Sequence, residues 1–358
     1  MSSPPHLWMR HEVRASETRA PLTPKDAAQL VRRGVRVTVE ESPQRAFPLA
    51  DYAGAGCATA ARGSWPSAPH DAYVLGLKEL PDTPHELRHR HIYFGHAYKA
   101  QPGAARLLRR FTAGGGVLLD LEHLTDEAGR RHAAFGYWAG YVGAALAVLH
   151  RRGALSAPLR PGSRADLDAL LAAGASEPGC SALVIGALGR CGRGARDALA
   201  VAGTAPTCWD LAETRSLDRA ALLRHDVLVN TVLVNRPVPP FLTPAQLPAA
   251  GRRLSVIADV TCDVNSPLNV LPLSTALTTW ERPALRLLDA PPPVDLIAID
   301  NLPALVPVVA SRSFSADLLP HLGVLDAAPA WARCRAAFAT AVGRHPSPTD
   351  SEEEAHAR

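Results

Sequence analysis

The sequence predicts an α/β protein of two domains with parallel sheets, and three observations lead to this prediction. The chain has 358 residues, and a typical domain takes about 150, so the length suits about two domains. Short apolar runs alternate with helix-like segments, which is typical of parallel sheets. A glycine-rich turn at residues 186–192 joins an apolar run to a helix, as in a nucleotide-binding unit.

Composition and charge exclude several classes of protein. With 47% hydrophobic and 20% charged residues, the chain can bury a substantial core. Its 38 basic and 34 acidic residues give a net charge of +4, which is too balanced for a nucleic-acid partner. The six cysteines form no C-x-x-C pair, and no apolar run suits a signal peptide or a membrane span. We therefore expect a cytoplasmic protein with free thiols, no metal site and no membrane or nucleic-acid partner.

The first hundred residues predict alternating strands and helices. Residues 7–9 and 35–39 suit strands. Between them, Thr23 and Pro24 suit the N-cap and the first residue of a helix that ends at Gly34. Residues 73–77, 92–94 and 117–119 suit three further short strands. Because ligands gather at the carboxyl ends of parallel strands, the residues that follow these three runs are candidates for a site.

Charged residues follow each of these three runs. Lys78 and Glu79 follow the first, His96 follows the second, and Asp120 and Glu122 come at the end of the third. A lysine between an apolar wall and a carboxylate is a tunable acid/base or a Schiff-base amine; the alternative is a solvated Lys–Glu pair. A histidine titrates near neutrality and can take and return a proton, or else it is a structural group.

Two other groups of residues have a functional and a structural interpretation. The histidines of residues 85–91 have metal-ligand spacing, but the interleaved arginines oppose a cation, so a solvated basic loop is favoured. Arg19, Arg130 and Arg131 are candidates for binding carboxylates, because guanidinium pairs with them bidentately. The alternative for each arginine is a surface charge.

The second half carries the strongest local signal. Residues 129–152 predict a long helix that is apolar nearly all round and therefore buried. Further on, residues 181–185 suit a strand that feeds a turn containing Gly186, Gly189 and Gly192. These glycines allow a tight turn, a close approach to a pyrophosphate, and packing of the next helix, at 193–202, on the strand. The spacing G-x-x-G-x-x-G also fits a turn without a ligand.

An acid after the next strand favours the nucleotide-binding interpretation. Asp210 ends a strand at residues 206–210 and lies 210 − 192 = 18 residues after Gly192. This spacing is close to the roughly 20 residues that separate the turn from an acid that holds ribose hydroxyls. A carboxylate there favours NAD over NADP, although Arg215 leaves NADP open. Strands at 226–230 and 255–260 continue the sheet.

Several segments occur in an order that is typical of one family. They include ETRAPLTP, GLKELP, GHAYKAQ, LLDLE, GRRHAAFGYWAG, VIGALGRCGRGA and AIDNLPALVP, and they run from about Arg10 to Trp331. Together they resemble the saccharopine dehydrogenases of the NAD-dependent, lysine-forming type. The wider superfamily includes alanine dehydrogenase and the hydride-transferring domain of transhydrogenase.

The resemblance implies two Rossmann-like domains with the active site in the interdomain cleft. Residues 1–132 and 321–345 would form the substrate/catalytic domain, and residues 133–320 would form the NAD-binding domain. Residues 346–358 are acidic and punctuated by proline, and are expected to be disordered. The implied reaction is the oxidation of a secondary amine to an imine, which is hydrolysed to L-lysine and 2-oxoglutarate, or the reverse condensation.

The resemblance also implies roles for single residues. Lys78 and His96 match an acid/base pair, and Arg19 and Arg131 match groups that hold substrate carboxylates. The other substrate-side matches are Glu79, Lys99, Glu122 and Phe135. The cofactor-side matches are Gly186, Leu188, Gly189, Arg190, Cys191, Gly192, Asp210, Thr231 and Asp300. The expected partners are an amino acid and a 2-oxo acid, bound by a monomer or small homo-oligomer.

Four positions depart from the family pattern. Arg14 stands where lysine is frequent, Asn301 stands where histidine is usual, and Val308 and Val309 replace an Arg-Glu pair. These departures leave open a related dehydrogenase with a different substrate, a deaminase like alanine dehydrogenase, or a dinucleotide-binding homologue without activity. In some relatives the cysteine that matches Cys191 forms a disulfide with a partner near residue 230. Because Thr231 cannot supply that partner, the disulfide is expected to be absent.

Overall fold

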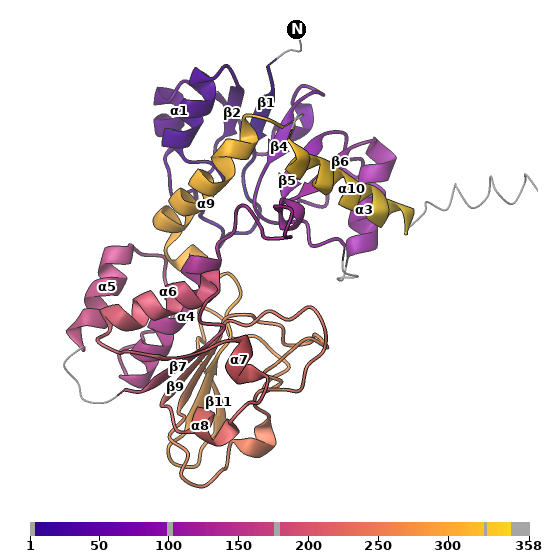
Figure 1. The fold of residues 1–358 in the computed structure, drawn as a ribbon. Helices are drawn as coiled ribbons and strands as arrows, with labels where there is room; N and C mark the ends of the chain where they lie inside the picture. The colour runs from indigo at the N-terminus through magenta and orange to yellow at the C-terminus, as the bar shows by residue number, and fades with distance from the viewer. Residues whose placement is uncertain (1–3, 99–102, 175–179, 326–327, 345–358) are drawn as a thin grey trace, which may run out of the picture. The chain divides into compact units, whose positions relative to one another are not determined.

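The computed structural model describes residues 4–98, 103–174, 180–325 and 328–344 (Figure 1). Lys99 and the acidic tail from residue 346 lie outside the described residues. Contacts within the chain divide it into two units: unit 1 is residues 1–134 with 310–358, and unit 2 is residues 135–309. The domain boundaries inferred from the sequence, 132/133 and 320/321, stay a prediction.

Unit 1 contains a six-stranded sheet in the order β3-β2-β1-β4-β5-β6. Every neighbouring pair in it is parallel, as the sequence predicts. The strands are β1 (His6–Met9), β2 (Arg36–Glu40), β3 (Ala58–Ala60), β4 (Tyr73–Leu75), β5 (Arg90–Tyr93) and β6 (Val117–Asp120). Strand β4 ends two residues earlier than predicted, so residues 76 and 77 already belong to the turn that leads to Lys78.

The helices of unit 1 begin where the sequence gives local signals. In α1 (Pro24–Arg32) the Thr23 hydroxyl accepts the Asp26 N–H at 3.3 Å, and Gly34, with φ of 85°, follows the helix. The other helices are α2 (Leu49–Gly54), α3 (Ala104–Gly114), α10 (Pro329–Gly343) and most of α9 (Pro307–Leu322). Helices α9 and α10 therefore return from the end of the chain to this unit, and α10 packs beside α3 and β6 (Figure 1).

Unit 2 contains a second six-stranded sheet in the order β11-β12-β10-β9-β7-β8. The strands are β7 (Ala182–Ile185), β8 (Thr207–Trp209), β9 (Val227–Asn230), β10 (Val256–Asp259), β11 (Leu285–Leu288) and β12 (Val294–Ile297). All pairs are parallel except that of β11 with β12, which is antiparallel at the sheet edge. The helices are α4 (Gly136–Arg151), α5 (Arg164–Ala173), α6 (Arg190–Val201), α7 (Leu211–Thr214) and α8 (Arg219–Leu223).

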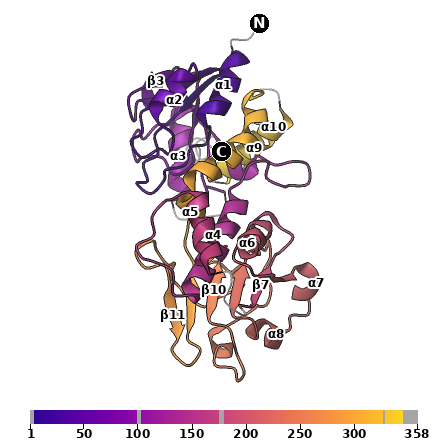
Figure 2. The ribbon, with the colours of Figure 1, turned by 90° about the vertical axis from the view of Figure 1, so that its left-hand side faces the viewer.

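Glycines bring α4 and α6 into close contact, and the two helices lie side by side in both ribbon views (Figures 1 and 2). A side chain at Gly140 would overlap the backbone carbonyl of Cys191, and one at Gly194 would overlap that of Tyr137. Eleven of the sixteen residues of α4 are buried. The predicted burial of this helix is therefore confirmed, and α4 fixes the position of the start of α6.

Two predicted helix starts are wrong, and the predicted solvated loop at residues 85–91 is confirmed only for the exposed His85, Glu86 and Arg88. The long helix begins at Gly136 rather than at residue 129, because residues 125 and 131 form a bridge that closes a turn between them. Helix α6 begins at Arg190, three residues before the predicted start. His89 and His91 are buried rather than solvated: His89 Nε2 lies 3.0 Å from the Ala68 carbonyl, and the ring of His91 packs edge-on against Trp65 at 5.0 Å.

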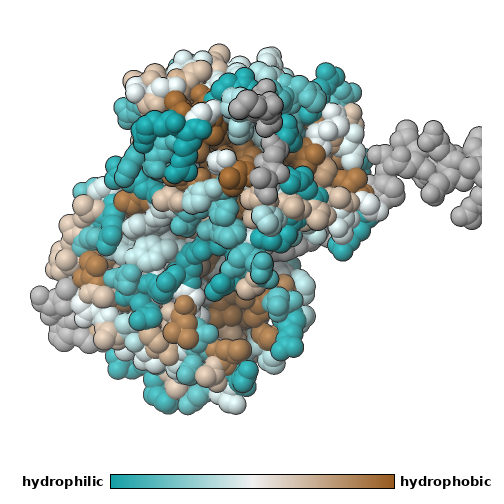
Figure 3. All heavy atoms as spheres, turned by 45° about the horizontal axis from the view of Figure 1, so that its top comes forward, coloured by the Kyte–Doolittle hydropathy of each residue, from teal (hydrophilic) through white to brown (hydrophobic). Residues whose placement is uncertain are grey.

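The described surface is mixed in character. On the face drawn in Figure 3, hydrophobic residues lie in separate groups among hydrophilic ones. Within the described ranges, no helix is both long enough and apolar enough to cross a membrane.

Candidate active site

The charged residues predicted at three strand ends lie along one edge of the sheet of unit 1. Strands β4, β5 and β6 are consecutive and parallel. Beyond the strands, the Phe94 N–H donates to the Leu77 carbonyl at 3.2 Å. Lys78 follows Leu77 by one residue and His96 follows Phe94 by two. The two candidate acid/base residues therefore follow neighbouring strands, β4 and β5, at the same edge of the sheet.

His96 sits in a constrained turn with an accessible ring. Its φ is 48°, in the left-handed region that a non-glycine residue seldom adopts. Its side chain is 52% exposed, and Nδ1 lies 3.6 Å from Oε1 of Glu122. The ring also stacks on Phe94, with 19° between the planes. The imidazole is thus open to a ligand on one side and faces a carboxylate on the other.

Glu122 links His96 to the predicted carboxylate-binding Arg131. Arg131 Nη1 lies 3.8 Å from the same Oε1 that faces His96. The Glu122 backbone is fixed by Asp120, whose Oδ1 accepts the Glu122 N–H at 2.9 Å. Burial raises the pKa of Asp120 to about 7, although backbone N–H groups act in the opposite direction. A carboxyl group of unusual proton affinity therefore supports this corner of the site.

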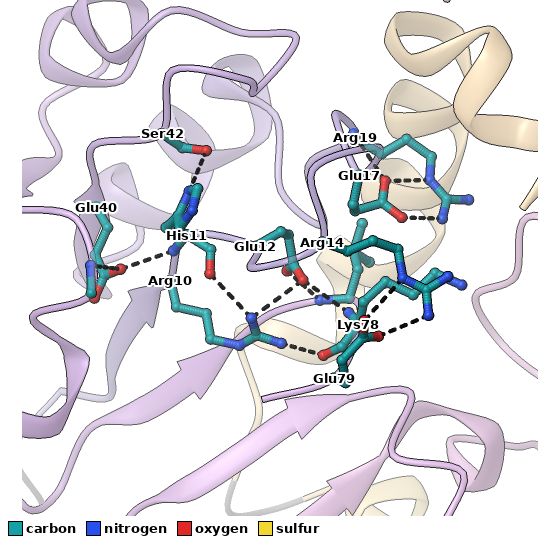
Figure 4. A network of polar contacts seen from close by, with 12 residues as sticks. Arg10, His11, Glu12, Arg14, Glu17, Arg19, Glu40, Ser42, Lys78 and Glu79 are labelled. Carbon is teal, nitrogen blue, oxygen red and sulfur yellow. Dashed lines mark hydrogen bonds and ion pairs between the residues drawn. The ribbon is translucent and has the colours of Figure 1, made fainter. Parts of the chain in front are cut away.

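Glu79, the neighbour of Lys78, binds Arg14 rather than standing alone. Its Oε1 and Oε2 accept from Nε and Nη2 of Arg14 at 3.0 and 3.1 Å (Figure 4). Burial works to raise the pKa of Glu79, but the Arg14 hydrogen bonds and the positive charges of Arg14 and Lys78 outweigh it, so this pKa is lowered. Arg14, which stands where lysine is frequent in the family, therefore forms a bidentate ion pair with Glu79 beside Lys78.

Arg19 forms a second bidentate pair, with Glu17. Arg19 Nε donates to Glu17 Oε1 at 2.8 Å and Nη2 donates to Oε2 at 2.5 Å, and both residues are buried (Figure 4). Of the other arginine candidates, Arg130 binds Asp126 at 2.8 Å on the surface. Each of these guanidinium groups is thus held by an acid of the chain.

The structure adds two residues that sequence reasoning misses, Arg10 and Glu12. Oε1 and Oε2 of Glu12 accept the backbone N–H groups of Leu77 and Lys78 at 2.7 and 3.0 Å. Arg10 donates to the Lys78 carbonyl and lies 3.2 Å from Glu12 (Figure 4). The only signal for them in the sequence is a charged segment directly after the strand of residues 6–9.

In unit 2 the residues of the predicted glycine turn form a tight, closely packed turn. Gly186 has φ of 81°, and Thr231 Oγ1 donates to the carbonyls of Ile185 and Gly186 at 2.8 and 3.1 Å. A side chain at Gly192 would overlap the Gly186 carbonyl and the backbone of Ala187. Gly189 is the N-cap of α6 and has no side chain to bond the first N–H groups of that helix. Such a helix start suits an anion.

The other cofactor-side candidates surround this turn. Asp210 Oδ2 accepts the Leu188 N–H at 3.0 Å, and Oδ1 accepts the Leu211 N–H at 2.9 Å, which fixes the carboxylate at the end of β8. Leu188 is 74% exposed. Arg190 and Cys191 form the first turn of α6. Asp300 is exposed and follows β12, and Asn301 after it has φ of 69°.

The predicted residues thus fall into two groups, one in each unit. Lys78, Glu79, His96, Glu122, Arg19 and Arg131 belong to unit 1. The turn residues 186–192, Asp210, Thr231 and Asp300 belong to unit 2, as does Phe135, the N-cap of α4. All six cysteines lie in the described ranges and none forms a disulfide, Cys191 included. Among the described residues, no three His, Cys, Asp or Glu side chains gather as metal ligands would.

Comparison with known proteins gives relatives over nearly the whole chain. The chain is 39% identical over 364 residues to saccharopine dehydrogenase [NAD(+), L-lysine-forming] of Schizosaccharomyces pombe, which covers 94% of this chain and 98% of the relative. It is 41% identical over 340 residues to the protein of the same name from Emericella nidulans, with 88% and 91% coverage.

The fold agrees with more distant proteins. Residues 8–142 match the family model described as alanine dehydrogenase/PNT, N-terminal domain. A solved L-alanine dehydrogenase superposes with a TM-score of 0.66 at 18% identity, covering 93% of both chains. A transhydrogenase from Sinorhizobium meliloti gives 0.63 at 15% identity, covering 90% of this chain and 94% of that one. An α/β chain with two mainly parallel sheets is therefore a known arrangement.

Identity at this level over almost the full length of both chains, together with the matching order of motifs, leads to one conclusion: the chain belongs to the family of NAD-dependent, lysine-forming saccharopine dehydrogenases.

Proposed function

We propose that this protein is an NAD-dependent oxidoreductase that oxidises the secondary amine of saccharopine. The resulting imine is hydrolysed to L-lysine and 2-oxoglutarate, and the reverse condensation runs over the same residues. The observation that carries the proposal is the 39% identity across 98% of the length of a relative that bears this name. The convergence of Lys78 and His96 on one sheet edge supports it independently.

In this proposal Lys78 manages the proton of the secondary amine. Hydride leaves a carbon most readily when its nitrogen has a free lone pair, so the amine must be neutral at that step. Lys78 is half-buried and its positive charge acts on the neighbouring carboxylate of Glu79, and we assign it the role of accepting this proton. Bound NAD supplies the chemistry of hydride acceptance.

His96 acts on the water that attacks the imine. Its exposed ring and its 3.6 Å approach to Glu122 suit a group that takes a proton from water and returns it as the carbinolamine collapses. Glu122 offsets the positive charge that the imidazole gains in this step. Arg19 and Arg131, each beside an acid, are the candidate groups for the substrate carboxylates.

The residues of unit 2 fit a dinucleotide. The α6 start, with Gly189 as an N-cap that has no side chain, would hold the pyrophosphate, and Asp210 would hold the ribose hydroxyls. The close packing of Gly192 on the turn leaves no room for a side chain there. Leu188, Arg190, Cys191, Thr231 and Asp300 are the remaining proposed contacts.

The test is the formation of reduced cofactor from saccharopine and NAD, followed by absorbance. Lys78→Met and His96→Gln should each lower turnover by about 100-fold or more, the usual contribution of an acid/base group. Lys25→Met, at an exposed position on α1, is the matched control and should keep full turnover. NADH binding, followed by fluorescence, checks that the variants are folded. Unchanged turnover in both site variants would overturn the site assignment.

The substitutions at Val308 and Val309 favour a second candidate, a related dehydrogenase with another substrate or a homologue that binds dinucleotide without turnover. A panel of lysine with several 2-oxo acids, with NADH and NADPH in turn, separates these cases from saccharopine. L-alanine with NAD tests the deaminase alternative. NADH binding without any turnover across the panel would favour the non-catalytic homologue.

We further propose that the protein acts on these small molecules in the cytoplasm, as a monomer or small homo-oligomer. Six cysteines that form no disulfide support a reducing compartment. Light scattering after gel filtration measures the oligomeric state, and cell fractionation measures the location.

A further inference from the structure

On its β5 side the turn that carries Lys78 is held by backbone bonds, but on its β1 side it is held by side chains. Strand β4 lies between β1 and β5 in the sheet and ends at Leu75. The last backbone bond to the β1 side runs from the Arg10 N–H to the Leu75 carbonyl at 3.0 Å. Beyond it, polar groups of Leu77 and Lys78 need other partners, because buried backbone groups are seldom left unpaired.

Two side chains from the segment after β1 supply these partners. Glu12 accepts the N–H groups of Leu77 and Lys78 at 2.7 and 3.0 Å, one on each carboxylate oxygen. Arg10 donates to the carbonyl of Lys78 and, at 3.1 Å, to that of His11. Both the N–H and the C=O of Lys78 are therefore bound, and Cα of this residue is fixed from two sides (Figure 4).

The two side chains are themselves fixed. Arg10 Nη1 lies 3.2 Å from Glu12 Oε2, and the exposed fractions of the two side chains are 1% and 5%. Burial raises the pKa of Glu12, while Arg10 and the two backbone N–H groups act in the opposite direction. The Arg10 guanidinium lies against Gly76, where an added Cβ would be 2.5 Å from Nε. A glycine at position 76 is therefore required for Arg10 to reach this place.

We propose that Arg10 and Glu12 are positioning residues that hold the backbone of Lys78, and so aim its amine, in the reaction. The proposal rests on the proposed role of Lys78. A lysine has a flexible four-carbon stem, so the position of its amine is defined only if the backbone that bears it is fixed. Small errors in the placement of a reacting group cost large factors in rate. Because both side chains are buried, the pair would act through the backbone of Lys78.

Glu12→Gln is the first variant, because glutamine keeps the length of the side chain and loses one acceptor oxygen and the charge. Gly76→Ala is the second, because it displaces Arg10 and leaves both charges present. Asp26→Asn is the matched control. Asp26 is a buried carboxylate of the same unit, and its partners are side chains of the α1 N-cap, α1 and α9: Thr23, Gln29 and Ser315 donate to it at 2.9, 3.1 and 2.6 Å.

The chain has only three lysines, Lys25, Lys78 and Lys99, so the amine of Lys78 can be observed directly. Reductive methylation with ¹³C-formaldehyde labels each lysine, and Lys25→Met and Lys78→Met assign the resonances. In Glu12→Gln and Gly76→Ala, the Lys78 resonance should shift or broaden while that of Lys25 stays in place. In Asp26→Asn the Lys78 resonance should match that of the wild type.

For each variant, kcat for saccharopine and the NADH dissociation constant are measured and compared with those of the wild type. Glu12→Gln and Gly76→Ala should lower kcat at least tenfold and change the dissociation constant less than twofold, and Asp26→Asn should change neither. A folded Glu12→Gln protein with wild-type kcat and an unmoved Lys78 resonance would overturn the proposal. Failure of both site variants to fold would show a folding role only and would also overturn it. If the wild type does not turn over saccharopine, the proposed function fails, and the resonance still tests the positioning role.

Discussion

The carboxyl group of Asp120 accepts the backbone N–H of Glu122 at 2.9 Å, and only 1% of Asp120 is exposed. This bond connects the end of β6 to the carboxylate that faces His96. Because Asp120 is buried, its pKa is raised to about 7, whereas an aspartate in an unfolded chain titrates near 3.9. Asp120 therefore makes the stability of unit 1 depend on pH.

The sign of this dependence follows from proton binding. Between about pH 4 and pH 7 the folded protein holds a proton on Asp120 that the unfolded chain has released, so stability falls as the pH rises through this range. Asp120→Asn keeps the oxygen that accepts the Glu122 N–H and removes the titration. Between about pH 5 and pH 8, the free energy of unfolding of the variant should rise relative to that of the wild type by on the order of 2–3 kcal/mol. Denaturant unfolding at the two pH values measures this gain. An equal change in the free energy of unfolding of the two proteins between these pH values would contradict it.

Arg14→Lys restores the residue that is frequent in the family and should change little. Lysine cannot form the bidentate pair with Glu79, but the side chains of Arg14 and Glu79 are 36% and 51% exposed. An exposed ion pair contributes under about 1 kcal/mol, so we expect the unfolding midpoint to stay within about 3 °C. We also expect kcat to stay within about threefold. A larger loss of activity would show that this chain depends on arginine here, and Lys25→Met serves as a charge-changing control remote from the site.

The sequence is sufficient to predict the strand ends that carry the candidate site. Alternating apolar runs place β4, β5 and β6 within two residues of their observed limits. Parallel pairing then puts the residues that follow them at one sheet edge. The cap at Thr23 and the glycine turn of unit 2 are also predictable, because each depends on a local conformational preference.

Contacts between distant segments are not predictable in this way. Glu12 binds residues 77 and 78, which are 65 and 66 positions away, and no local pattern marks such a pair. His91 is buried because the segment at Trp65 covers it, whereas its neighbours in sequence suggest a solvated loop. The predicted start of α4 is wrong because small and apolar residues continue upstream of the helix. There the bridge between residues 125 and 131 prevents a helix.

Thr231→Val should weaken dinucleotide binding. The variant keeps the shape of the side chain and loses the hydroxyl that bonds the carbonyls of Ile185 and Gly186. Gly186 begins the turn with φ of 81°, so this hydroxyl restrains the backbone that would approach the pyrophosphate. We expect a 3- to 30-fold rise in the NADH dissociation constant, equivalent to about 0.7–2 kcal/mol, measured by fluorescence titration. Thr231→Ser retains the hydroxyl and should bind nearly as the wild type does; equal affinity of all three proteins would reject this role.

Gly140→Ala tests the packing that fixes the start of α6. An added Cβ would overlap the carbonyl of Cys191, and a backbone group cannot move aside as the end of a flexible side chain can. Overpacking of this kind costs about 1–3 kcal/mol or more, so the unfolding midpoint should fall by several degrees. Gly54→Ala is the control: Gly54 ends α2, nothing lies within 4 Å of a Cβ added there, and alanine is a better helix former by about 1 kcal/mol. The two Gly→Ala changes should thus shift the midpoint in opposite directions, and because α6 carries the proposed phosphate-binding N-terminus, only Gly140→Ala should also weaken NADH binding.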